Sequence, residues 1–124
     1  MYEVTIEKTF SAAHALSEIG GKCESLHGHN FTVEVTVAGP ELNGQGLLLD
    51  FRVLKEWTGA VLDRLDHRFL NEVPSFRGRN PSSENIARFI FDEMKKNLAG
   101  TSLTVSKVTV RESENARATY RENG

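Results

Sequence analysis

The chain has 124 residues, a formal net charge of -2, 39% hydrophobic residues and 26% charged residues. These values predict one globular domain over residues 1–124 and exclude a strongly basic surface for nucleic acid. No apolar run approaches the roughly 20 residues that span a membrane. A single cysteine excludes an internal disulfide, and no signal-peptide pattern begins the chain, so we expect a cytoplasmic protein.

The first half of the chain begins with two predicted strands. Over residues 2–14 apolar side chains alternate with polar ones, at Tyr2, Val4, Ile6, Phe10 and Ala12. A loop over residues 17–25 separates this strand from a second one, which alternates at Phe31, Val33, Val35 and Val37. His14 shares the parity of the first apolar face, and His27 and His29 share that of the second. All three imidazoles would therefore point to the covered side of the sheet.

Two helices are predicted next. Asp50 is a candidate N-cap for a helix that ends near Asp66-His67, with apolar residues at helical spacing between them. Residues 71–80 form a predicted loop. The segment Pro81-Ser82-Ser83 opens the second helix, and Ala99-Gly100 stops it.

Two closing strands complete the chain, around residues 108–112 and 116–120. Leu103 and Val105 are out of phase with Val108 and Val110, which predicts a bulge near Ser106-Lys107. The element order β-β-α-α-β-β favours an α+β fold, with an antiparallel four-stranded sheet covered by two helices on one face. Glu112 shares the parity of the apolar face, where an unpaired carboxylate is costly. A strand ending before this residue would instead leave it solvated.

The three histidines are the strongest functional signal. Imidazole nitrogen is a usual ligand of zinc, and a His-x-His pair on one strand places two rings on the same side. Three protein ligands leave a fourth position open, which is typical of catalytic zinc. The alternatives are a chance cluster of histidines, or a closed structural site in which Cys23 is the fourth ligand.

Three further groups have a functional and a structural interpretation. Cys23 lies among small and polar neighbours, which favours a reactive thiol over a buried apolar side chain. In Asp66-His67 the carboxylate could orient the imidazole, although a histidine at a helix C-terminus is also explained by the helix dipole. Arg77 and Arg79 could bind phosphate or lie in a solvated loop.

Taken together, the chain resembles the family of 6-pyruvoyl-tetrahydropterin and 6-carboxy-tetrahydropterin synthases over nearly its whole length. Six segments carry this resemblance in order: Phe10-Ser11-Ala12-Ala13-His14, Cys23-x-x-x-His27-Gly28-His29, Leu49-Asp50-Phe51, Leu65-Asp66-His67, Pro81-Ser82-Ser83-Glu84-Asn85 and Val110-x-Glu112. The resemblance implies a T-fold and a homo-oligomer built from trimers, with a hexamer expected, whose active sites lie between subunits.

The resemblance also implies roles for individual residues. His14, His27 and His29 would bind Zn²⁺, and the substrate would be 7,8-dihydroneopterin triphosphate. Cys23 would act as general base, and His67, held by Asp66, as the general acid partner. Glu112 would anchor the pterin, and Ser82 and Ser83 would contact it. Lys22, Arg77 and Arg79 are candidates for holding the triphosphate.

The spacing of three residues between Cys23 and His27 resembles the bacterial 6-carboxy-tetrahydropterin synthases of 7-deazaguanine (queuosine) biosynthesis, which release acetaldehyde. A pyruvoyl-forming enzyme is one alternative. Because folate-pathway relatives use a glutamate near the thiol position, Glu24 makes a 6-hydroxymethyl-dihydropterin-forming activity another alternative. A non-catalytic zinc-binding module is the alternative from a different class.

Overall fold

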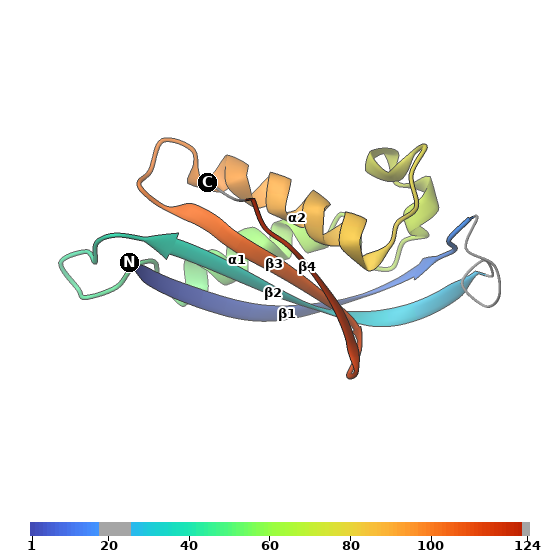
Figure 1. Ribbon diagram of the computed structural model, residues 1–124, viewed down its shortest axis with the longest axis horizontal. Coiled ribbons are helices and arrows are strands. Elements are labelled where there is room, and N and C mark those ends of the chain that lie inside the picture. The colour runs from blue at the N-terminus through green and yellow to red at the C-terminus, as the bar shows by residue number, and fades with distance from the viewer. Residues whose placement is uncertain (18–25, 123–124) are drawn as a thin grey trace.

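The computed structural model of the protein describes residues 1–17 and 26–122. Its elements are β1 (Tyr2–His14), β2 (His27–Gly39), α1 (Phe51–Leu62), the short 3₁₀ helices η2 (Leu70–Glu72) and η3 (Pro74–Phe76), α2 (Ser83–Leu98), β3 (Thr104–Ser113) and β4 (Ala116–Tyr120). The strands form one antiparallel sheet in the order β1-β2-β3-β4, and α1 and α2 pack against it (Figure 1). The predicted α+β architecture is confirmed.

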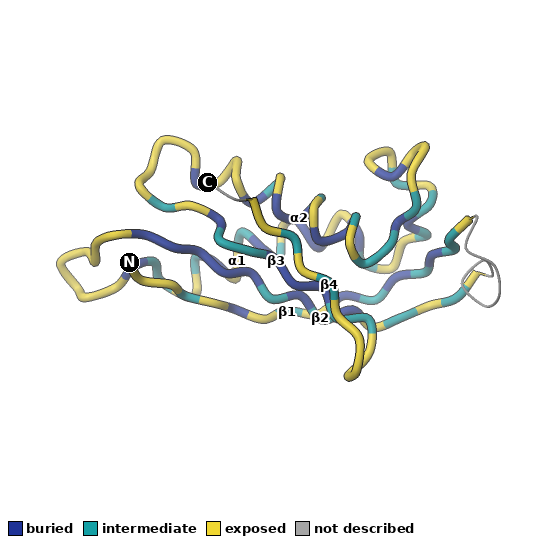
Figure 2. Tube along the Cα trace, viewed as in Figure 1, coloured by how far each residue is buried: buried dark blue, intermediate teal, exposed yellow. Residues whose placement is uncertain are grey.

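The core lies between the sheet and the two helices, where Figure 2 shows the chain as buried. Phe10 pairs with Phe31 across β1 and β2, and their rings stack with centroids 4.9 Å apart. Val33 and Val110 are opposite each other in β2 and β3, and both are fully buried. Alternation of apolar and polar residues therefore gives the sheet one dry face, as the sequence predicts.

Two bulges interrupt the register of β3. Thr36 pairs with Lys107 but Val37 pairs with Val105, so Ser106 is the extra residue, and the predicted bulge near Ser106-Lys107 is confirmed. A second shift occurs against β4 between Arg111 and Ser113, which places Glu112 within it. A bulge bends its strand and redirects a side chain, so this second bulge changes the direction in which the Glu112 side chain points.

Helix α1 begins at its predicted N-cap, where the Asp50 side chain accepts a hydrogen bond from the Arg52 amide. It ends at Leu62, before the predicted boundary at Asp66-His67, and this prediction is wrong. The apolar period continues to Leu65, which is fully buried, although the backbone has already left the helix through tight turns. Periodicity follows burial rather than hydrogen bonding, which explains the error.

Helix α2 begins after Ser82, whose hydroxyl accepts a hydrogen bond from the Asn85 amide, as an N-cap does. It ends at Leu98, and Gly100 adopts a left-handed φ of 81° just beyond. The predicted start and stop are both confirmed. In the described part of the chain, no helix is long and apolar enough to cross a membrane.

Candidate metal centre and active site

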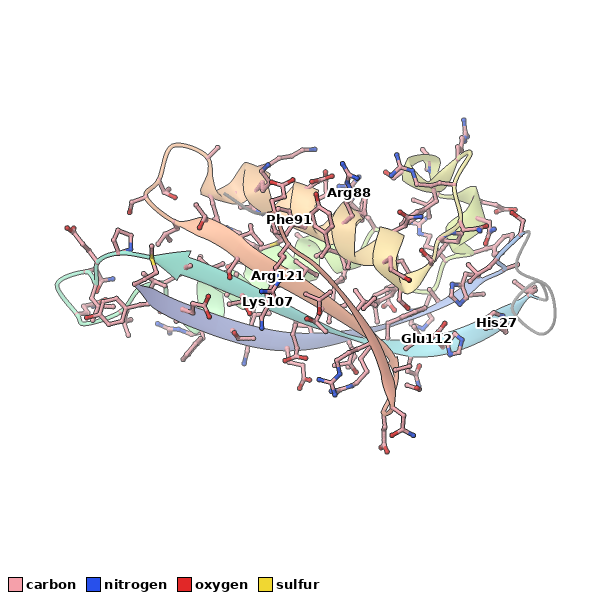
Figure 3. The ribbon with its side chains drawn as sticks, viewed as in Figure 1. His27, Arg88, Phe91, Lys107, Glu112 and Arg121 are labelled. Carbon is pink, nitrogen blue, oxygen red and sulfur yellow. The ribbon has the colours of Figure 1, made fainter. Side chains whose placement is uncertain are left out.

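His14, His27, His29 and Glu112 come together in one cluster, and Figure 3 shows its members His27 and Glu112 toward the end of the sheet that lies away from the N-terminus. The antiparallel register places His14 directly opposite His27, while His29 lies opposite Ala12. One potential ligand atom from each of the four side chains lies within 4.8 Å of all the others. The three predicted histidines are therefore clustered, and a carboxylate joins them.

Glu112 reaches the histidines from β3. Its Oε1 lies 3.1 Å from Nε2 of His14 and 3.1 Å from Nε2 of His29. Strand β3 continues to Ser113 and Glu112 contacts two imidazoles, so the interpretation of a carboxylate beyond the strand end is wrong, although the side chain is still 32% exposed. The bulge explains how a residue that faces the covered side still lies partly open to solvent.

The protonation of His14 can be derived from its contacts. Its Nδ1 lies 2.8 Å from the carbonyl oxygen of Pro81, and a carbonyl only accepts, so Nδ1–H is the donor. In a neutral ring Nε2 then carries a lone pair, and this atom is buried without a hydrogen-bond partner in the described structure. The nearby Oε1 of Glu112 is also an acceptor. Two acceptors 3.1 Å apart require a proton or a cation between them.

The donor set fits a zinc ion. Zinc takes imidazole nitrogen and carboxylate oxygen, and its histidine ligands commonly donate their other N–H to a backbone carbonyl, as His14 does to Pro81. Burial lowers the pKa of His29, and His27 and His14 lower it further against the opposing effect of Glu112. The His29 ring is thus favoured in the neutral, ligand-competent form.

The side chains of Asp66 and His67 contact each other beside β1. The His67 amide donates to the Ser11 carbonyl over 2.6 Å, and the Ser11 amide donates to Asp66 Oδ1 over 2.9 Å. Asp66 Oδ2 in turn lies 3.0 Å from Nδ1 of His67, whose side chain is 82% exposed. The hydrogen bond from Ser11 is the largest cause of a lowered pKa for Asp66.

This arrangement favours one of the two interpretations of Asp66-His67. Helix α1 has ended before these residues, so a favourable helix dipole does not explain the histidine. His67 instead has a φ of 58°, which non-glycine residues rarely adopt and which often occurs at functional sites. The carboxylate is placed to orient the imidazole, as the functional interpretation requires.

A hollow of about 420 Å³ is lined by His29 and His67, together with Ser11, Ala13 and Asn30. Arg68 also lines the hollow and was not identified from the sequence. Its only signal in the sequence is its position directly after Asp66-His67. Arg77 and Arg79 belong to neither the lining nor the cluster.

The remaining predicted residues divide into two groups. Ser82 has a structural role as the N-cap of α2, and Ser83 is the first residue of that helix. Lys22, Cys23 and Glu24 lie outside the described residues, so their predicted roles remain predictions.

Comparison with known proteins identifies the family. Residues 3–123 match the family described as 6-pyruvoyl tetrahydropterin synthase. The chain belongs to this family. It is 35% identical over 127 residues to 6-carboxy-5,6,7,8-tetrahydropterin synthase of Bacillus subtilis, covering 97% of this chain and 85% of the relative. It is also 42% identical over 92 residues to dihydroneopterin monophosphate aldolase of Pyrococcus furiosus, covering 74% of each.

Among solved structures, 6-pyruvoyl tetrahydropterin synthase of Caenorhabditis elegans superposes with a TM-score of 0.83 at 33% identity, covering 99% of this chain and 98% of that one. The predicted T-fold is confirmed by this likeness. The protein is thus an enzyme of the tetrahydropterin synthase family, and the resemblance inferred from six segments is confirmed.

Proposed function

We propose that the protein is a zinc-dependent carbon–carbon lyase that converts 7,8-dihydroneopterin triphosphate to 6-carboxy-5,6,7,8-tetrahydropterin, with release of acetaldehyde and triphosphate, for 7-deazaguanine (queuosine) biosynthesis. The observation that carries the proposal concerns Nε2 of His14. This atom is buried, has no hydrogen-bond partner in the described structure and faces the Glu112 carboxylate. The name of the Bacillus subtilis relative, a 6-carboxy-5,6,7,8-tetrahydropterin synthase, supports the choice of product.

His14, His27 and His29 hold the zinc ion in this proposal. When bound, zinc polarises the side-chain hydroxyls of the substrate and stabilises negative charge that develops on them. The three rings come from two paired strands with a fixed register, so little rearrangement is needed to bind a cation. The buried His14 anchors the site, and the partly exposed His27 and His29 form its open side.

Glu112 accepts hydrogen bonds from the amino-pyrimidine edge of the pterin, and this places the substrate side chain beside the histidines. A planar carboxylate with two oxygens matches two adjacent N–H groups. Its 32% exposure makes it reachable from solvent, and its position within 3.1 Å of two rings brings the pterin to the cluster. The same position would also allow Glu112 to bind the cation directly, which its substitution by glutamine tests below.

The protein's own acid–base groups move the protons. His67, oriented by the Asp66 carboxylate 3.0 Å away, acts as the general acid partner. Cys23 acts as the general base that removes a proton from the substrate side chain. Ser82 and Ser83 contact the pterin and contribute less to its binding than Glu112 does, because the Ser82 hydroxyl already accepts the capping hydrogen bond of α2.

An oligomer built from trimers, expected to be a hexamer, is part of the same proposal. On the sheet face away from the helices, the edge strand β1 carries Glu3 and Glu7, and the opposite edge strand β4 carries Arg117. Glu7 already forms an ion pair with Arg111 of β3 in the same chain, so Glu3 and Arg117 are the charges at the two edges that a neighbouring copy would meet. Pairing the β1 edge of one copy with the β4 edge of the next would close a ring and cover both edges. Sedimentation analysis tests this, and a monomer at working concentration would contradict it.

A second candidate is a 6-hydroxymethyl-dihydropterin-forming activity. It is favoured by the sequence identity to the dihydroneopterin monophosphate aldolase of Pyrococcus furiosus and by Glu24 next to Cys23. A 6-pyruvoyl-tetrahydropterin product is the third possibility within the family.

One experiment separates these candidates. The zinc-loaded protein is incubated with 7,8-dihydroneopterin triphosphate, and the product is identified by its mass, which differs among the carboxy, pyruvoyl and hydroxymethyl pterins. We expect the carboxy product together with acetaldehyde. Another pterin product would replace the proposed reaction by the corresponding alternative, and no turnover would contradict all three.

A further inference from the structure

Two asparagine side chains hold the chain that follows β1. Asn71 Oδ1 accepts a hydrogen bond of 2.9 Å from the Ala15 amide, and its Nδ2 donates one of 2.7 Å to the Ala15 carbonyl. A side-chain amide that binds both the N–H and the C=O of one residue imitates a neighbouring strand. It satisfies the Ala15 backbone where β1 has ended.

Asn80 holds the backbone of Ser17 in the same way. Its Oδ1 accepts 2.8 Å and 3.0 Å hydrogen bonds from the amide and the hydroxyl of Ser17, and its Nδ2 donates to the Ser17 carbonyl over 3.0 Å. Asn80 is itself anchored to α2, because its carbonyl accepts a 2.8 Å hydrogen bond from Nδ2 of Asn85. Ser17 is therefore tied to the start of α2 through one side chain.

The same segment also holds His14. Pro81 follows Asn80 directly, and its carbonyl accepts the hydrogen bond from Nδ1 of His14. The segment that begins at Asn80 thus contacts the ring of His14 and the backbone three residues later. Asn71 holds the residue between them, so three successive attachments fix the end of β1.

We propose that Asn71 and Asn80 are positioning residues for the histidine–glutamate cluster. By fixing the backbone at Ala15 and Ser17, they keep Nδ1 of His14 on Pro81 and therefore direct Nε2 toward His27, His29 and Glu112. Neither asparagine belongs to the cluster, so each acts only through His14. The inference rests on the proposed function, in which the cluster holds a cation.

A purely structural role makes a different prediction. If the asparagines only close a loop, their removal would lower the free energy of unfolding and leave cation affinity unchanged. Removing a group that orients a metal ligand typically weakens metal binding by about 10–100-fold. Affinity and stability therefore separate the two interpretations.

The first measurement is zinc affinity by competition with a chromogenic chelator. Asn71→Ala and Asn80→Ala are each expected to bind zinc about 10–100-fold more weakly than wild type. The matched control is Asn43→Ala, because Asn43 also uses its Oδ1 to hold a turn, accepting from the amides of Gln45 and Leu47. That turn lies outside the cluster, and its loss should leave zinc affinity unchanged. Equal affinities for all three variants would overturn the proposal.

The second measurement uses the metal-free protein and does not depend on activity. Nitrogen-15 NMR of His14, recorded at an alkaline pH at which the imidazole is neutral, is expected to show a single tautomer with the proton on Nδ1 in wild type. A mixture of tautomers is expected in Asn71→Ala and Asn80→Ala. The wild-type tautomer in both variants would overturn the proposal even if their zinc affinity fell.

If Asn80→Ala does not fold, Asn80→Asp replaces it. This variant keeps the acceptor for the amide and hydroxyl of Ser17 but turns the donor to the Ser17 carbonyl into a repulsive oxygen. The same loss of affinity and of the single tautomer is expected.

A wild-type protein with the expected tautomer but without zinc binding would contradict the proposed function, and the NMR comparison would still test the positioning role.

Discussion

Ser11 and Asp66 are joined by a hydrogen bond of 2.9 Å from the Ser11 amide to Asp66 Oδ1, across 55 residues of sequence. The Ser11 carbonyl also accepts the His67 amide. One residue of β1 therefore holds both the carboxylate and the backbone of the Asp66-His67 pair, and it sets the direction of the imidazole.

The charge of Asp66 should contribute to stability in a pH-dependent way. The Ser11 amide lowers the pKa of Asp66 in the folded protein below its ordinary value of 3.8. A carboxyl group whose pKa is lower in the folded protein than in the unfolded chain adds to the free energy of unfolding. This contribution is complete at pH values above the pKa of the unfolded chain, and it is lost as the pH falls through the pKa of the folded protein. Asp66→Asn should therefore unfold more easily than wild type at neutral pH, and the difference should shrink on acidification below about pH 4.

Urea unfolding at a series of pH values measures this difference. Asp63→Asn is the control, because Asp63 is an exposed carboxylate at the C-cap of α1. A difference between wild type and Asp66→Asn that does not change with pH would contradict the assignment.

Removal of one proposed ligand should remove most of the bound zinc. His27→Ala is expected to weaken zinc binding by more than the ~10–100-fold typical of a group that only supports a ligand. The control is His67→Ala. This variant loses an imidazole that does not belong to the cluster, so it should bind zinc normally while losing turnover. Metal content by mass spectrometry checks both. Full zinc occupancy in His27→Ala would exclude His27 as a ligand.

Glu112→Gln should weaken pterin binding and leave zinc bound. A hydrogen bond to a charged group contributes about 1.5–3 kcal/mol, or roughly 10–150-fold in Kd. Calorimetric titration with a pterin, with zinc content measured in parallel, tests this role. Unchanged pterin affinity would refute the anchoring role, and loss of zinc would make Glu112 a ligand instead.

Cys23→Ala separates a catalytic thiol from a structural one. We expect turnover to fall by about 10²–10⁴-fold, the typical contribution of a general base, while zinc content and thermal stability stay close to wild type. Cys23→Ser serves as a control of similar size. Loss of both metal and stability in Cys23→Ala would favour the closed four-ligand site and a non-catalytic module.

The strand parity of the sequence predicted much of the site. His14, His27 and His29 lie on the apolar faces of two strands, and pairing these strands was sufficient to bring the rings together. Glu112 was placed on the correct face for the same reason. Its aim depends on a bulge against β4, however, and the sequence near Ser113 contains no phase change that reveals it.

Loop contacts were the part that the sequence could not predict. The hydrogen bonds of Asn71 and Asn80 to Ala15 and Ser17 join residues far apart in sequence, and asparagine in a loop is ordinarily explained by local turns. The contact between Asp66 and His67 also depends on tertiary structure, because the left-handed backbone of His67 is held by Ser11. Periodicity contains no information about such dihedral angles.

The left-handed φ of 58° at His67 means that conformational preference and chemistry make opposite demands on position 67. A side chain in this conformation costs roughly 1–2 kcal/mol that glycine avoids. Among variants without the imidazole, His67→Gly should accordingly be more stable than His67→Ala by about that amount, as thermal denaturation can measure. A substitution to glycine chosen to raise stability at this position would therefore remove the imidazole for which the backbone strain is tolerated.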